Sequence, residues 1–222
     1  MPPIARRRAS GWQRWAGIFK FQTPKKITNA LIPPMNSAVF LDRDGTLIEE
    51  KEYLCRPEEV TVLAGTGKAL RRLQDAGFKL FIVSNQSGVG RGYFTLDEVA
   101  LTNERLLEVL GQDGVDIEKV YIAPEAPDVP SRGRKPSPQF LFDARDEFGI
   151  ELAVSYMVGD KLLDLECGWN AGVKRSILVR TGYGAGIERD HAEVVKRAVV
   201  VDDLPAAAEV MLAERHGTER MR

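Results

Sequence analysis

The chain has 222 residues, of which 44% are hydrophobic and 28% charged, proportions that are ordinary for a soluble globular protein. The formal net charge is −1, but residues 1–34 carry seven basic and no acidic side chains, so the remainder has 24 basic and 32 acidic residues and a net charge of −8. This acidic remainder argues against nucleic-acid binding, no apolar run is long enough to cross a bilayer, and two distant cysteines favour a reducing cytoplasm over a secreted disulfide framework.

The first predicted element is a basic segment, residues 1–34. Its aromatic and small residues recur at helical spacing beside arginines, at Trp12, Trp15, Ala16 and Phe19. One interpretation is an amphipathic helix that contacts a membrane surface or a partner. The alternatives are a disordered tail, or a misassigned start with translation beginning at Met35. We favour these alternatives, because basic blocks at chain termini are commonly disordered.

From residue 37 onward, apolar runs of strand length alternate with helical patterns. Strands are predicted at Ala38–Leu41, Phe78–Val83, Val120–Ala123, Val154–Val158, Ile177–Val179 and Val199–Val201. Helices are predicted at Gly67–Ala76, from the Thr95 capping box to about Gly111, from Ser137-Pro138 to Gly149, at Leu162–Ala171 and at Leu204–Leu212. This alternation predicts an α/β fold, a doubly wound parallel sheet of the Rossmann-like type. We assign it to a domain at residues 35–215, followed by a tail at 216–222.

The most informative motif directly follows the first strand. Asp42 and Asp44 are one residue apart and precede Gly45, so they lie at the carboxyl end of a buried strand, where open α/β sheets keep their ligand sites. Because side chains alternate along a strand, we expect the two carboxylates to face the same way and Arg43 to point elsewhere. The alternative is an acidic strand-to-turn junction, since Asp-Gly is an ordinary turn signal.

Three further polar clusters follow later in the chain, at residues 84–92, 132–136 and 159–164. Each alone is typical of a turn or a solvated loop, but the strand-to-helix loops of a parallel sheet emerge at one edge, so all can converge. Asp42 and Asp160 offer hard oxygen ligands to Mg²⁺, and Ser84 and Lys135 offer a hydroxyl and a cation to a phosphoryl group. Together these groups indicate phosphoryl transfer.

The motifs Asp42-Arg-Asp-Gly-Thr46, Ser84-Asn-Gln, Lys135 and Gly159-Asp-Lys161 with Asp164 resemble those of the haloacid dehalogenase-like phosphatases. The longer runs 84–95, 134–136, 155–161 and 178–182 resemble the D-glycero-D-manno-heptose 1,7-bisphosphate 7-phosphatases, of which histidinol-phosphate phosphatases are close relatives. The resemblance covers about residues 37–212. It implies a haloacid dehalogenase-like fold and a Mg²⁺-dependent phosphomonoesterase that removes the 7-phosphate, in the synthesis of ADP- or GDP-heptose for surface glycans such as lipopolysaccharide.

The resemblance also implies residue roles. Asp42 would attack phosphorus to form an aspartyl-phosphate, and Asp44 would act first as acid and then as base. Ser84 and Lys135 would stabilise the phosphoryl group. Mg²⁺ would be held by Asp42, the backbone carbonyl of Asp44, and Asp160, with Asp164 acting indirectly and Lys161 adjacent without being a ligand. The positions that match substrate contacts are Glu50, Lys51, Glu52, Tyr53, Asn85, Gln86, Ser87 and Arg134, with Arg91 as a further candidate.

Spacing and composition predict two features that bear on the substrate. The intervals between the motifs leave no room for a separate cap domain, so the site should be open. Relatives often carry a zinc loop of three Cys and one His just before Arg-Lys-Pro, but residues 124–133 contain neither residue, so we expect no structural zinc. The glycine-rich segment Gly182–Gly186 lacks the full nucleotide-binding fingerprint and is interpreted as a flexible connection.

Several functions remain as alternatives. The same chemistry could act on histidinol phosphate or another small phosphomonoester, because the altered loop helps to shape the pocket. A nucleic-acid end-processing phosphatase is disfavoured by the acidic domain. A protein tethered to a membrane or partner by residues 1–34 is disfavoured by the intact motifs. The expected partner is a small phosphorylated sugar, and we expect a monomer or small homo-oligomer.

Overall fold

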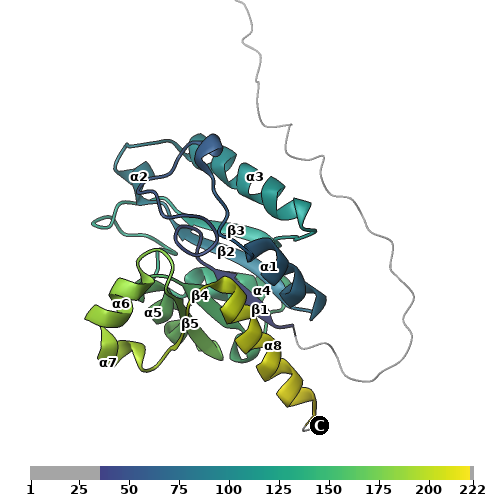
Figure 1. The fold of residues 1–222 in the computed structure, drawn as a ribbon. Coiled ribbons are helices and arrows are strands. Elements are labelled where there is room, and N and C mark those ends of the chain that lie inside the picture. The colour runs from purple at the N-terminus through teal and green to yellow at the C-terminus, as the bar shows by residue number, and fades with distance from the viewer. Residues whose placement is uncertain (1–35, 221–222) are drawn as a thin grey trace, which may run out of the picture. The chain divides into compact units, whose positions relative to one another are not determined.

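A computed structural model describes residues 36–220 of the chain, with side chains described through Arg215. The described residues form a six-stranded sheet in the order β3-β2-β1-β4-β5-β6 (Figure 1). The strands are β1 (Ala38–Leu41), β2 (Lys79–Asn85), β3 (Lys119–Ala123), β4 (Tyr156–Gly159), β5 (Arg175–Val179) and β6 (Val199–Val201). All neighbouring pairs run parallel, which confirms the predicted α/β sheet.

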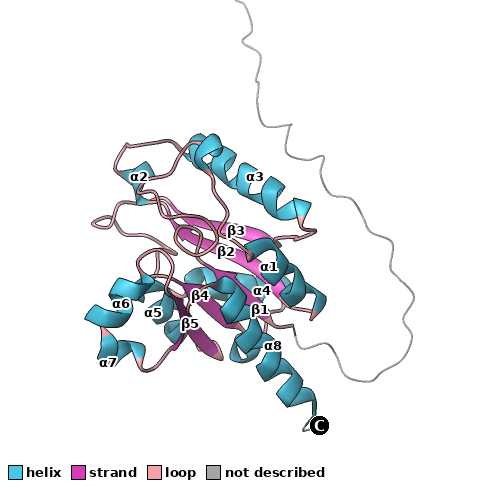
Figure 2. Cartoon of the chain, in the orientation of Figure 1, coloured by secondary structure: helices cyan, strands magenta, loops and turns pink. Residues whose placement is uncertain are grey.

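Helices connect the strands (Figure 2). They are α1 (Thr66–Asp75), α2 (Ser87–Gly90), α3 (Leu96–Gln112), α4 (Gln139–Phe148), α5 (Leu162–Ala171), α6 (Gly184–Asp190), α7 (Ala192–Val195) and α8 (Leu204–Arg220), with 3-10 turns at Pro57–Glu59 and Leu152–Val154. Helix α3 begins with the predicted capping box: Thr95 Oγ1 accepts from the Glu98 N–H at 3.2 Å, and Glu98 Oε2 accepts from the Thr95 N–H at 2.7 Å. This reciprocal pair satisfies two donors that the first helical turn leaves free.

The sheet is covered on both faces because its central strands are apolar on both sides. Val39 and Leu41 of β1 pack in one core with α1, α3 and α8. Ala38 and Phe40 point the other way, into a core with α4 and α5. Alternation along the strand thus divides four fully buried side chains between two layers of helices. This is the doubly wound arrangement that the sequence predicts.

The connections at the carboxyl edge contain only small elements. Within residues 36–220, the connection from β1 to α1 holds a 3-10 turn and isolated bridges from Ile48 to Asp44 and Val62, and the connection from β2 to β3 holds α2 and α3. Neither of these described connections contains a separate cap domain, as predicted. The edge of the sheet that carries the motifs is therefore bounded by loops rather than by a second domain.

Some predicted boundaries were wrong. Helix α8 continues to Arg220, well beyond the predicted end at Leu212. The helices α2, α6 and α7 were not predicted, and Gly184–Gly186 opens α6 instead of forming a flexible connection. The interpretations of residues 1–34 lie outside the described residues. Across residues 36–220, every helix is too short or too polar to span a membrane.

Phe40 tests the packing of β1. Its ring is fully buried and stacks on Phe81 with the ring centroids 5.3 Å apart. Phe40→Ala should lower the free energy of unfolding by about 3–5 kcal/mol, because it removes apolar contacts and leaves a cavity. Urea denaturation followed by circular dichroism measures the loss. Leu101→Ala, at a side chain 52% exposed on α3, is the control and should stay within about 0.5 kcal/mol of the wild type. A Phe40→Ala loss below about 1 kcal/mol would contradict this packing.

Candidate active site

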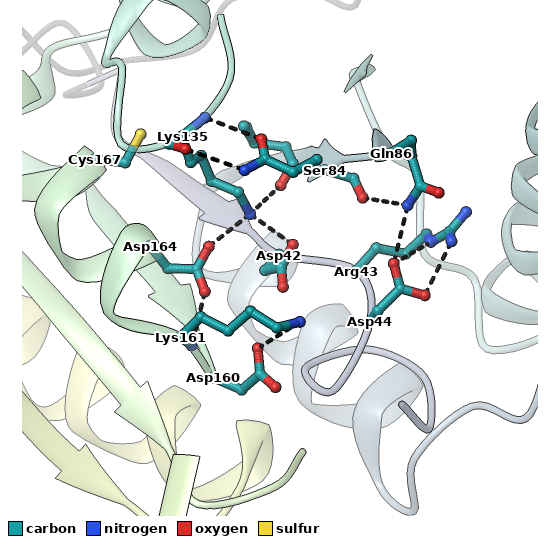
Figure 3. Close-up of polar contacts among 12 residues, drawn as sticks. Asp42, Arg43, Asp44, Ser84, Gln86, Lys135, Asp160, Lys161, Asp164 and Cys167 are labelled. Carbon is teal, nitrogen blue, oxygen red and sulfur yellow. Dashed lines mark hydrogen bonds and ion pairs between the residues drawn. The ribbon is translucent and has the colours of Figure 1, made fainter. Parts of the chain in front are cut away.

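A cavity of about 400 Å³ opens at the carboxyl edge of the sheet, where β1 ends. Its lining includes the predicted residues Asp42, Asp44, Glu50, Glu52, Tyr53, Asn85, Gln86, Ser87, Arg134, Lys135, Lys161 and Asp164. Ser84 and Asp160 are buried beside lining residues, whereas Lys51 and Arg91 are exposed and outside the lining. Figure 3 shows how the buried members of this set point toward one another. The structure therefore brings together the motifs that follow β1, β2 and β4.

Asp42 and Lys135 form a buried ion pair at the floor of the cavity (Figure 3). Lys135 Nζ lies 2.6 Å from Asp42 Oδ1 and donates to the Val83 carbonyl at 2.7 Å. Burial would raise the pKa of Asp42, but the charges of Lys135 and Lys161 hold it below its ordinary value. Burial would lower the pKa of Lys135, but Asp164 and Asp42 raise it. The pair therefore keeps Asp42 ionised, the form needed for a nucleophile.

The side chain of Asn85 holds the backbone of Lys135 through two hydrogen bonds. Its Oδ1 accepts from the Lys135 N–H at 2.9 Å, and its Nδ2 donates to the Lys135 carbonyl at 3.1 Å. Both ends of one amide thus hold the backbone of the loop before α4 against the end of β2. Asn85 was predicted to bind substrate, and the structure adds this positioning role.

Asp42, Asp160 and Asp164 form an acidic cluster. One ligand oxygen from each lies within 4.8 Å of the others, and all three residues are buried. Burial and the charge of Asp42 raise the pKa of Asp160 to about 8 and that of Asp164 to about 6. Both effects favour the neutral acid, so the ionised forms of these two carboxyl groups need further positive charge.

The cluster fits a divalent cation by its donor chemistry. Asp160 Oδ2 accepts from the Tyr183 N–H at 2.9 Å, while the buried Asp160 Oδ1 has no hydrogen-bond partner among the described residues. Lys161 Nζ is 3.6 Å from that oxygen and pairs with Glu50 at 2.8 Å. A carboxylate oxygen left without a donor in an acidic cluster suits a hard cation such as Mg²⁺.

Asp44 lies apart from the acidic cluster, held by Arg43 (Figure 3). Arg43 Nε and Nη2 donate to the two Asp44 oxygens at 3.0 and 2.9 Å, and Nη1 donates to Asn103 at 2.9 Å. Gln86 Nε2 donates to Asp44 at 3.0 Å and to Ser84 Oγ at 2.8 Å. The expectation that Arg43 points elsewhere was wrong. Alternation fixes the start of a side chain, but this long guanidinium folds back onto its neighbour.

The loop after β1 forms one wall of the cavity. Glu52 and Tyr53 have φ of 30° and 59°, in the left-handed region that non-glycine residues rarely adopt. The Tyr53 ring meets Tyr93 edge to face, with the centroids 4.8 Å apart. Lys51, predicted to bind substrate, lies outside the cavity lining, and its amine donates to the Glu59 carbonyl and to Thr61 on the loop itself.

Hydrogen bonds within the chain close the loop at 124–136. Ser131 Oγ donates to Glu125 Oε2 at 2.6 Å and accepts from the Arg134 N–H at 3.2 Å. Arg134 Nη1 donates to the Glu125 carbonyl at 3.2 Å. Burial, and after it the charge of Arg91, lowers the pKa of Arg134. The charge of Glu125 raises this pKa and offsets part of the shift.

Residues of the site that sequence reasoning missed include Arg43, Asn103, Leu163 and Tyr183. Leu163 and Tyr183 line the cavity, and Asn103 anchors Arg43 from the buried side of α3. A polar residue at a buried helix position was the available signal for Asn103. Tyr183 follows β5 at the same sheet edge as the other motifs, which was its signal.

The chain is similar to known proteins over most of its described length. A family model described as HAD-hydrolase-like matches residues 133–207. The chain is similar to the D-glycero-beta-D-manno-heptose-1,7-bisphosphate 7-phosphatase of Haemophilus ducreyi, with 39% identity over 73% of this chain and 94% of that protein. It is also similar to the D-glycero-D-manno-heptose-1,7-bisphosphate 7-phosphatase of Thermosynechococcus vestitus, with 37% identity over 78% of this chain and 93% of that protein.

A solved structure gives the same result. The D,D-heptose 1,7-bisphosphate phosphatase from B. bronchiseptica, complexed with magnesium and phosphate, matches with a TM-score of 0.74 and 30% identity. The match covers 80% of this chain and 99% of that chain. It therefore extends over nearly the whole of the solved protein.

The acidic cluster predicts a stabilising response to Mg²⁺. At about 100 times its Kd, the ion should stabilise the folded protein by about 2.7 kcal/mol, which raises Tm by about 5–10 °C for a domain of this size. Asp160→Asn should lose this rise. In EDTA the variant should be at least as stable as the wild type, because it removes one of three clustered carboxyl groups.

Differential scanning fluorimetry with and without Mg²⁺ measures both effects. Asp190→Asn, at an exposed residue of α6, is the matched control and should keep the wild-type response. An unchanged Mg²⁺ response in Asp160→Asn would contradict the assignment of the cation to this cluster.

Proposed function

This chain belongs to the D-glycero-D-manno-heptose 1,7-bisphosphate 7-phosphatases of the haloacid dehalogenase-like hydrolases, and we propose that it hydrolyses the 7-phosphate ester of that sugar through Asp42. The predicted family is confirmed by relatives that the chain matches over nearly their full length. The observation that carries the mechanism is the buried Lys135–Asp42 pair beside Asp160 and Asp164 on the cavity floor. It combines an ionised nucleophile, a fixed cation and a cation-binding cluster.

In the first step, a carboxylate oxygen of Asp42 attacks the 7-phosphorus. The new Asp42 oxygen–phosphorus bond forms as the bond to the sugar oxygen breaks. Asp44 lines the same cavity and, once protonated in the substrate complex, gives that proton to the departing oxygen. The products are heptose 1-phosphate and an aspartyl-phosphate, in which Lys135 faces the phosphoryl oxygens from the Asp42 side.

In the second step, water replaces Asp42 on phosphorus. Asp44, now deprotonated, takes a proton from the attacking water, and the bond from phosphorus to Asp42 breaks. Inorganic phosphate leaves and both aspartates return to their starting forms. Asp42 and Asp160, with Asp164 beside them, would hold Mg²⁺, which when bound offsets the negative charge on the transferring phosphoryl oxygens.

The rest of the substrate lies along the cavity wall. Arg134 lines the cavity and presents a planar cation suited to the second phosphate of a bisphosphate. The open edge leaves space for a seven-carbon sugar between the two phosphates. Histidinol phosphate is the second candidate, because its family is a close relative, but it has a single phosphate and would leave Arg134 without that partner.

The substrate assignment is tested by phosphate release in Mg²⁺ from both anomers of D-glycero-D-manno-heptose 1,7-bisphosphate, from histidinol phosphate and from simple sugar phosphates. We expect one bisphosphate anomer to be hydrolysed with the highest kcat/KM, by about 10²-fold or more, with the 1-phosphate retained. Mass spectrometry of the product locates the remaining phosphate. Equal or better hydrolysis of histidinol phosphate would overturn the heptose assignment while leaving the phosphatase chemistry intact.

Asp42→Asn tests the covalent route. We expect kcat to fall by at least about 10³-fold, because the amide is a poor nucleophile and the Lys135 pair is lost. Rapid acid quench of wild type with labelled substrate should trap label on the protein, and Asp42→Asn should trap none. Asp190→Asn serves as the control with wild-type turnover. Appreciable turnover in Asp42→Asn would contradict the aspartyl-phosphate.

A further inference from the structure

Tyr183 is held rigidly at the rim of the cavity. Thr181 Oγ1 donates to the Gly45 carbonyl at 2.6 Å, which ties the segment after β5 to the loop after β1. Gly182 has φ of 55°, and a Cβ there would lie 2.7 Å from the Gly45 Cα, so only glycine permits this approach. The Tyr183 N–H then donates to Asp160 at 2.9 Å. The backbone of Tyr183 is therefore held by Asp160, one of the three residues of the acidic cluster.

The Tyr183 ring is presented to the cavity rather than packed in the core. The residue is 44% exposed, yet it lines the cavity together with Leu163, which is 36% exposed. Lys161 Nζ lies 4.9 Å from the ring centroid and is itself held by Glu50 at 2.8 Å. A cation at this distance from a tyrosine ring is attracted by it. The ring is thus restrained before any ligand arrives.

The rim after β5 presents an accessible aromatic surface to the cavity. Sheet order places the loops that follow β2 and β3 on one side of Asp42, where the lining includes Ser87, Arg134 and the buried Phe94. The loops that follow β4 and β5 lie on the other side, where Leu163 and Tyr183 line the cavity beside charged residues. Because Leu163 and Tyr183 are both partly exposed, this side offers an aromatic ring and an aliphatic side chain for contact with a ligand.

We infer that the Tyr183 ring, supported by Leu163, forms the specificity wall against which the carbon face of the sugar packs. This rests on the proposed function. A phosphate ester bound at Asp42 extends its sugar toward the rim, and the C–H face of a sugar ring packs favourably on an aromatic ring that buries large apolar area. Tyr183 does not touch the reacting atoms, so it selects the sugar rather than accelerates bond cleavage.

Tyr183→Ala separates binding from chemistry. With heptose 1,7-bisphosphate, KM should rise about 10-fold, which corresponds to about 1.4 kcal/mol of lost contact, while kcat stays within about twofold. With glycerol 3-phosphate, which has no ring to pack, both constants should stay within about twofold of the wild type. Tyr183→Phe keeps the ring and should keep the wild-type KM within about twofold.

Controls distinguish the possible failures. Val194→Ala, at an exposed side chain of the neighbouring α7 outside the cavity, should behave as wild type on both substrates. An unchanged KM for Tyr183→Ala, or a Tyr183→Phe as impaired as Tyr183→Ala, overturns the role of the ring. An equal fall of kcat on both substrates would assign Tyr183 to positioning Lys161 and would also overturn the role of the ring as a specificity wall. A wild type without preference for the heptose bisphosphate overturns the proposed function as well.

Discussion

The site depends on one buried cation, the ammonium of Lys135. It is only 3% exposed and lies 2.6 Å from carboxylate oxygens of both Asp42 and Asp164. An unpaired charge in such a place costs several kcal/mol, so the lysine and its acids require one another. Lys135 also donates to β2, and Asn85 holds its backbone. The same group therefore joins β1, β2, α5 and the loop before α4, and the geometry of the site is part of the packing of the fold.

The charges around Lys135 do not balance within the chain. Asp42, Asp160, Asp164 and Glu50 surround Lys135 and Lys161 through ion pairs and close contacts, which leaves two negative charges in excess when every group is ionised. Asp44 adds nothing to this excess, because Arg43 pairs with it. Burial, and after it the charge of Asp42, raises the pKa values of Asp160 and Asp164. An excess of two charges, located at a buried oxygen without a donor, is matched by a divalent cation.

The sequence predicted the strands and the floor of the site because both follow from local rules. Apolar runs mark buried strands, and a parallel sheet necessarily brings the residues after each strand to one edge. The conformation of Arg43 could not be predicted, because alternation fixes its Cβ and not the end of its long side chain. Helix α6 was missed since its glycine-rich start has no capping signal. Its first turn is fixed by distant contacts of Gly182 and Tyr183 with Gly45 and Asp160.

This division between floor and rim separates chemistry from specificity. The floor groups are buried, charged and mutually dependent, so a change in one disturbs the others and the reaction they support. The rim consists of loops with fewer mutual constraints. In residues 124–136 the bonds from Ser131 and Arg134 to Glu125 shape the loop without any cysteine or histidine. The backbone before and at Tyr183 is fixed by hydrogen bonds to Gly45 and Asp160, so the side chain at position 183 can be replaced without changing the backbone. A substrate preference can therefore change at the rim while the buried floor stays the same.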